Sequence, residues 1–303
     1  DGAGAGAAVT DVLDMTGGTG NIGLGSGSLG TALTTGTDNV AIGEAALDAV
    51  TSGADNTAVG DNALGANTTA ANNVAVGSSA LLLNTTGASN TAIGAFALDA
   101  NTTASYNTGI GTSALGANTT GASNTALGAS ALVANTTGTK NVAIGHDALT
   151  TITTGSYNVA VGTEALKVNT ASGNTAVGQD ALKASTTGAS NTAVGQNALT
   201  SNTTGTYNTA LGYGALDAHT VANDCVAVGR DALGANTTAS SNVAVGAYAM
   251  LVNTTGTENT AVGFRALDAN TTASNNTAIG NAALGANTTG ADNTAVGKGS
   301  ADA

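Results

Sequence analysis

The sequence of 303 residues has no proline, no tryptophan, a single cysteine and only 8% charged residues. An ordinary globular domain has about 25% charged residues and about 5% proline, so the composition excludes an ordinary globular domain. With Cys225 as the one cysteine, no internal disulfide and no multi-cysteine metal site can form. The apolar runs are far shorter than the roughly 18 residues of a membrane-spanning helix. We therefore expect no membrane span in this segment.

Basic residues are also scarce: the six lysines and arginines lie far apart, and the net charge is −13. Without a basic patch, nucleic acid is not an expected partner. The two histidines, His146 and His219, lie in different repeats, and no spacing suggests an activated nucleophile, a metal cluster or a cofactor site. Gly25-Ser-Gly-Ser-Leu-Gly30 matches a dinucleotide-binding pattern, but no helix is expected after it, so we interpret it as chance. The sequence does not predict an enzyme.

What the sequence has is a five-residue word, Asn-(Thr/Val)-Ala-(Val/Ile)-Gly, repeated throughout a chain with 44 glycines. Clear copies are Asn39-Val-Ala-Ile-Gly43 and Asn141-Val-Ala-Ile-Gly145, and a degenerate first copy is Asn21-Ile-Gly-Leu-Gly25. The step between copies is 17 residues, except for 18 after Asn21 and 16 after Asn158. The consensus is N-(T/V)-A-(V/I/L)-G-x-x-A-L-x-A-N-T-T-G-x-x, in which the first asparagine is position 1.

Alternation within the word predicts a short strand in every repeat, with positions 2 and 4 on one face and positions 1, 3 and 5 on the other. A unit of 17 residues cannot close a core alone, but stacked units can. We therefore predict an all-β fold, a parallel β-solenoid of about 17 coils of 17 residues over residues 21–303, after a lead-in segment at residues 1–20. Positions 2, 4 and 9 are expected in the core.

Charged residues away from the chain ends fall only at positions 6, 7, 10 and 17, which predicts that these are solvent-exposed corners of the coil. Positions 3, 5 and 8 are nearly always Ala, Gly and Ala. Small uncharged residues suit close approach by another backbone, either a second strand of the same coil or another copy of the chain. We prefer the second interpretation, which makes Ala143, Gly145, Ala160 and Gly162 a candidate oligomer face.

Asparagine at position 1 is interpreted as structural, because stacked amides can hydrogen-bond to one another and to turn backbones. This structural asparagine row consists of Asn39, Asn56, Asn73, Asn90, Asn107, Asn124, Asn141, Asn158, Asn174, Asn191, Asn208, Asn242, Asn259, Asn276 and Asn293. One repeat departs from it, with Cys225 at position 1 and His219 at position 12. The Asn-Thr-Thr stretches match glycosylation acceptors, but turn propensity alone explains them.

The iterated word resembles the repeat of trimeric autotransporter adhesin heads, and related repeats occur in phage and bacterial fibre proteins. The resemblance covers residues from Asn21 onward, and the copies at Asn39 and Asn141 are the most similar. It implies a left-handed parallel β-roll, a homotrimer and a surface that binds host or matrix molecules. Two departures are the longer repeat, which contains the Asn-Thr-Thr-Gly stretch, and the lack of a coiled-coil stalk, neck or membrane anchor.

The expected function is an extracellular or cell-surface structural segment, or part of a phage fibre, that supplies length and a repetitive adhesive surface. Its expected partners are further copies of itself and an unidentified surface receptor or matrix. One alternative is a ligand- or ice-binding solenoid, which an exposed strand with Thr-x-Thr spacing would favour. Another is a filament that polymerises end to end. The start of the sequence lacks signal-peptide features, so a mature or excised segment is expected.

Overall fold

The computed structural model describes residues 19–301 and divides the chain into two compact units, Asp1–Lys140 and Asn141–Ala303. Most of the predicted lead-in segment, residues 1–18, lies outside the described residues, as do residues 302–303. The strands of the first unit are β1 (Ile22–Leu24), β2 (Val40–Ile42), β3 (Thr57–Val59), β4 (Val74–Val76), β5 (Thr91–Ile93), β6 (Thr108–Ile110) and β7 (Thr125–Leu127). Those of the second are β8 (Val142–Ile144), β9 (Val159–Val161), β10 (Thr175–Val177), β11 (Thr192–Val194), β12 (Thr209–Leu211), β13 (Val226–Val228), β14 (Val243–Val245), β15 (Thr260–Val262), β16 (Thr277–Ile279) and β17 (Thr294–Val296).

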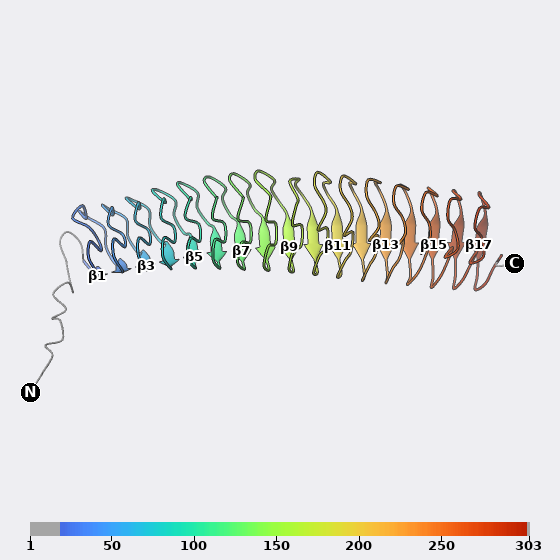
Figure 1. The fold of residues 1–303 in the computed structure, drawn as a ribbon, viewed down its shortest axis with the longest axis horizontal. Helices are drawn as coiled ribbons and strands as arrows, with labels where there is room; N and C mark the ends of the chain where they lie inside the picture. Colours follow the sequence, from blue (N-terminus) through green and yellow to red (C-terminus); the bar gives the residue numbers. More distant parts are fainter. Residues whose placement is uncertain (1–18, 302–303) are drawn as a thin grey trace, which may run out of the picture. The chain divides into compact units, whose positions relative to one another are not determined.

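Every strand is the three-residue centre of one repeat word. Within each unit, successive strands pair in parallel and in register, so that Ala143 lies opposite Ala160 and Ala41 opposite Ala58. The arrows of each unit accordingly lie side by side in Figure 1, with one turn of chain between each strand and the next. No helix occurs among residues 19–301. Each unit is therefore a parallel β-solenoid, which confirms the predicted fold class.

Backbone hydrogen bonds join neighbouring coils outside the strands as well. In the coil that contains β3, the N–H of Leu64 donates to the carbonyl oxygen of Ala80 in the next coil at 3.0 Å. On the other side, the N–H of Gly60 donates to the carbonyl oxygen of Ile42 at 2.7 Å. Because most N–H groups of the coil donate hydrogen bonds, a proline would remove a bond at most positions. The absence of proline from the sequence follows from this.

The interior of each coil is built from small residues and one leucine. In the coil of β8, Ala143, Ala148 and Leu149 at positions 3, 8 and 9 are all 0% exposed, whereas Val142 and Ile144 at positions 2 and 4 are half-buried. The same pattern recurs from coil to coil in both units. The prediction that position 9 is buried is confirmed. The prediction that positions 2 and 4 lie in the core is wrong: the alternation is there, but the two faces are exchanged.

The asparagine at position 1 explains why the small residues point inward. The side-chain amide of Asn141 donates to the carbonyl oxygen of Gly155 across the coil at 2.8 Å, and Asn141 is itself buried. Since alternate residues of a strand share a face, an inward Asn141 places Ala143 inward as well and turns Val142 and Ile144 outward. Satisfying a buried amide therefore takes precedence over burying two β-branched side chains.

Of the four predicted corners, positions 6 and 17 are mostly exposed, whereas positions 7 and 10 are mostly half-buried, as at Asp147 and Asp99. No Asp, Glu, Lys or Arg side chain among residues 19–301 is buried. Two of the corners, positions 7 and 17, adopt left-handed backbone conformations, as at Asn62 (φ 56°) and Asn72 (φ 62°). Asparagine, aspartate and serine are frequent there because their short polar side chains tolerate this conformation. The buried leucine of position 9 is left-handed too, as at Leu64 (φ 53°), because it fills the core at that turn.

Candidate functional surface

The strands present an uncharged surface of aliphatic and threonine side chains to solvent, which we call the outward strand face and define as positions 2 and 4 of every coil. Position 2 is Thr or Val except at Ile22, and position 4 is always Val, Ile or Leu. Several of these side chains are well exposed, including Ile42 (38%), Leu127 (44%) and Leu211 (47%). In the second unit the face runs over the ten strands β8 to β17, about 43 Å at the usual strand spacing.

The candidate oligomer face predicted at Ala143, Gly145, Ala160 and Gly162 is wrong. Ala143 and Ala160 are 0% exposed inside their own coils. Gly145 (φ 132°) and Gly162 (φ 133°) are closely approached by the next coil of the same chain, so that a Cβ on Gly145 would lie 2.6 Å from the carbonyl oxygen of Gly162. The small residues do meet another backbone, as expected, but it is that of the neighbouring coil rather than that of another molecule.

The asparagine row of position 1 forms a hydrogen-bonded ladder inside each unit. The backbone N–H and the Nδ2 amide of Asn39 both donate to Oδ1 of Asn21 at 3.0 Å, and Nδ2 also donates to the carbonyl oxygen of Gly53 at 2.9 Å. Asn56 repeats this pattern on Asn39. Such amides join two coils and close their own coil, which gives the row a structural role; Nδ2 of Asn107 is an exception and has no partner.

The asparagines at position 12 form a second hydrogen-bonded column, which the Asn-Thr-Thr pattern by itself did not predict. Nδ2 of Asn84 donates to the carbonyl oxygen of Gly87 at 2.9 Å and to Oδ1 of Asn67 at 3.3 Å. These asparagines open the Asn-Thr-Thr stretches and, apart from the half-buried Asn287, are 0% exposed, so a glycosylating enzyme could not reach the buried ones in the folded chain. The threonine that follows is also engaged: Oγ1 of Thr85 donates to the carbonyl oxygen of Thr102 at 3.0 Å.

The irregular repeat places His219 and Cys225 inside the coil, both 0% exposed. Nε2 of His219 lies 2.8 Å from the carbonyl oxygen of Ala222, which can only accept, so Nε2 carries the proton and Nδ1 accepts from Nδ2 of Asn236 at 3.1 Å. Burial lowers the pKa of His219. Oδ1 of Asn202, in the preceding coil, is left without a hydrogen-bond partner. The substitution is a local defect in the second asparagine column.

Cys225 takes the place of a position-1 asparagine. Its thiol donates to the carbonyl oxygen of Ala239 at 3.2 Å, as an asparagine amide does elsewhere, and its backbone N–H donates to Oδ1 of Asn208 at 3.0 Å. Burial raises the pKa of the thiol to about 11. Because the thiolate is the reactive form, this buried thiol is inert at neutral pH.

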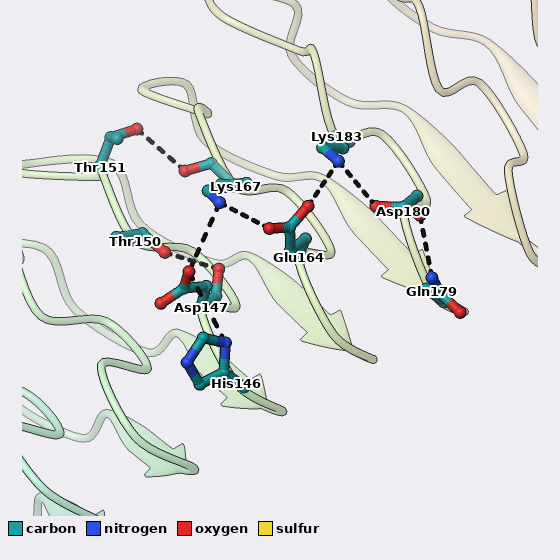
Figure 2. Close-up of polar contacts among 9 residues, drawn as sticks. All are labelled: His146, Asp147, Thr150, Thr151, Glu164, Lys167, Gln179, Asp180 and Lys183. Carbon is teal, nitrogen blue, oxygen red and sulfur yellow. Dashed lines mark hydrogen bonds and ion pairs between the residues drawn. The ribbon is translucent and has the colours of Figure 1, made fainter.

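Charged side chains at positions 7 and 10 form a ladder across three successive coils of the second unit (Figure 2). Glu164 accepts from Lys167 at 2.6 Å and from Lys183 at 2.5 Å, and the two lysines also reach Asp147 (3.4 Å) and Asp180 (3.1 Å) respectively. The hydrogen bonds from Lys167 and then Lys183 lower the pKa of Glu164 to about 2. Both lysines line a shallow groove on the surface, but their ammonium groups are already paired. The ladder joins coils and leaves no positive charge available for an anion.

A second cluster at the corners combines arginines with aromatic rings. We call it the Arg–aromatic patch, and its members are Tyr213, Arg230, Tyr248, Phe264 and Arg265, which occupy positions 6 and 7 of four consecutive coils. The guanidinium of Arg230 lies 4.5 Å from the centroid of the Tyr248 ring, and the Phe264 ring meets Tyr248 edge to face at 6.1 Å. Arg265 lies 5.9 Å from Tyr248 and 5.5 Å from Phe264.

The patch is not predicted by the sequence pattern, because its residues are dispersed along the chain and share two neighbouring positions rather than one. Comparing positions 6 and 7 across adjacent repeats would have found it. By contrast, the three tyrosines that share position 17, Tyr106, Tyr157 and Tyr207, are 61–70% exposed but lie in coils well separated along the chain, so they do not form a cluster.

Other predicted features can be placed within the described part of the chain. Gly25–Gly30 follows β1 and leads into a turn rather than a helix. Among residues 19–301, no group of three or more His, Cys, Asp or Glu side chains is arranged to hold a metal ion. In the same range, no helix has the length and hydropathy needed to cross a membrane. Compared with known proteins, the chain matches no family model and no curated protein.

Proposed function

We propose that the chain is a structural and adhesive segment of an extracellular or cell-surface fibre that works as a homotrimer through its outward strand face. The observation that carries the proposal is the composition of this face. Not one of the strands β1 to β17 has a charged residue at position 2 or 4, although these positions are half-buried or exposed, and never buried, in a single chain. A face that remained in water would be expected to include charged residues among so many copies.

The form of the face supports a further copy of the same chain as its partner. A solenoid presents the same two rows in coil after coil, so a second copy placed alongside would meet matching rows at matching intervals. Valine, isoleucine and leucine give such a contact its apolar burial, at roughly 25 cal/mol per Å². The similarity to adhesin-head repeats is what favours three copies over two.

The ice-binding alternative gains no support from the outward strand face. It was expected to show Thr-x-Thr spacing, but position 4 is aliphatic in every coil, and position 2 is valine in several, such as Val142 and Val159. The hydroxyls of position 13 are used for coil-to-coil hydrogen bonds, as at Thr85 and Thr102. We therefore propose the structural and adhesive role alone.

Sedimentation of the full chain tests the assembly. We expect a trimer, and we expect Val177→Asp with Val194→Asp on the outward strand face to yield monomers with an unchanged far-UV spectrum, because a carboxylate between apolar rows is costly to bury. The matched control is Gln179→Asp with Gln196→Asp, which adds the same charge at exposed position 6 and should leave the trimer intact. A monomeric wild-type chain would overturn the proposed assembly.

A further inference from the structure

The Arg–aromatic patch is unlike the rest of the surface. The chain has only seven Tyr and Phe residues in total and six Lys and Arg, yet three of those rings and two of those bases lie on one corner of the coils of β12 to β15. Tyr213 and Phe264 are 53% and 46% exposed, and the side chains of Arg230 and Arg265 are each 57% exposed. Exposed aromatic rings are costly in water, and Tyr and Arg are typical of binding surfaces.

The arrangement within the patch offers two kinds of contact. Arg230 stacked on Tyr248 is held in place, so that the edge of its guanidinium remains available to donate. The rings of Phe264 and Tyr213 supply apolar area at the same corner. A ligand that suits this surface needs an apolar side for the rings and hydrogen-bonding groups along its edge.

The carboxylates beside the arginines indicate which net charge a ligand of the patch should have. Asp231 lies 3.9 Å from Nε of Arg230, and Asp268 lies 3.9 Å from Nε of Arg265. The patch thus combines planar donors with planar acceptors and is nearly neutral. The chain as a whole has a net charge of −13, which repels polyanions. The ligand should therefore be uncharged and carry neighbouring groups that both donate and accept.

We propose that the Arg–aromatic patch binds a neutral, pyranose-containing glycan. A pyranose ring has an apolar face of C–H groups that packs on aromatic rings, and its neighbouring hydroxyls can accept from a guanidinium and donate to a carboxylate. Adjacent coils are about 4.8 Å apart, close to the length of one sugar residue in an extended glycan. Tyr213, Arg230, Tyr248 and Phe264 come from successive coils, so the patch can contact successive sugars.

Affinity electrophoresis of the full chain tests this proposal, with native gels that contain galactomannan, xyloglucan, mixed-linkage β-glucan or dextran. We expect at least one of these neutral polysaccharides to retard the protein. The double variant Tyr248→Asn with Phe264→Asn should lose the retardation, and Arg230→Gln should weaken it. These replacements already occur at the same positions in other coils, as Asn62, Asn281 and Gln196, so the fold should be kept; far-UV spectra check this.

The matched control is Tyr207→Asn, which removes an exposed tyrosine of the same unit outside the patch and should leave the retardation unchanged. Retardation by none of the neutral polysaccharides would overturn the proposal, and so would equal retardation of the double variant. Retardation only by polygalacturonate or hyaluronate would show an anion site instead. The inference gives a ligand class to the adhesive role proposed above, but the test does not depend on oligomeric state, so it can fail while the sedimentation result holds.

Discussion

The Cα of Gly145 lies so close to Gly162 in the next coil that an added Cβ would be 2.6 Å from the carbonyl oxygen of Gly162. The backbone of Gly145 is also left-handed, with φ of 132°, a conformation that few other residues adopt. Both constraints recur at position 5 of other coils in the same unit, such as Gly195 and Gly246. The stacking distance of the coils therefore depends on the lack of a side chain at this position.

Gly145→Ala should lower the free energy of unfolding by about 2–5 kcal/mol, because it combines backbone strain with overlap against the next coil. Gly234→Ala is the control. Gly234 lies at position 10, where other coils have larger residues such as Lys183 and Leu251, and its Cβ would meet nothing closer than 3.3 Å. Urea unfolding followed by circular dichroism measures both. An equal effect of the two substitutions would contradict the close approach.

Because position 9 faces the core and position 4 faces outward, we expect alanine substitutions at these two positions to lower the free energy of unfolding by different amounts. Leu149→Ala should cost about 2–5 kcal/mol, because Leu149 is fully buried. Ile144→Ala should cost about 1 kcal/mol in a single chain, because Ile144 is half-buried. Hydrogen exchange is the suitable measurement, since each coil contacts only its neighbours and the loss of protection should be local. A larger loss of stability from Ile144→Ala than from Leu149→Ala would instead show that positions 2 and 4 face the core.

The position of the strands, the stacking of coils and the charged corners could be predicted from the sequence because each depends on local periodicity. Which face of the strand points inward could not be predicted, because alternation shows which residues share a face and not which face is inside. Hydrophobicity favoured Val142 and Ile144 for the interior, and the hydrogen bond from Asn141 to Gly155 across the coil decided otherwise. That bond joins residues distant in sequence, as do the contacts of the Arg–aromatic patch, so neither is visible in a short window.

His219 should make stability depend on pH near neutrality. Its pKa in the folded chain is lowered from the usual 6.5 because burial disfavours the charged ring. Below about pH 6.5 the unfolded chain therefore binds a proton that the folded chain does not, so the free energy of unfolding falls as the pH is lowered. His219→Asn should reduce this dependence and supply a donor for Asn202. Thermal unfolding between pH 7.5 and 5.5 measures it, and His146→Asn, at an exposed imidazole, should change little.

The charged ladder should affect the pH dependence of stability at lower pH than His219 does. The pKa of Glu164 is about 2 in the folded chain against 4.5 in the absence of its lysine partners. Its contribution to stability is present above about pH 4.5 and is lost as the pH falls towards 2, because the unfolded chain takes up the proton first. Glu164→Gln should flatten the stability curve in this window, and 1 M salt should weaken the difference. Glu258→Gln, at an exposed corner, is the control; an identical curve for both variants would contradict the ladder.

The coil-to-coil hydrogen bonds also determine how a unit responds to force. Tension applied through its two ends loads the bonds of the outermost coil before those of the next, so coils should peel away in sequence rather than rupture together. Each released repeat of 17 residues would lengthen the tether by up to about 56–61 Å. A unit of this kind would unfold in small, equal steps under tension, and released repeats could refold onto the coils that remain. Repeated stretching would then unfold a few coils at a time rather than the whole unit.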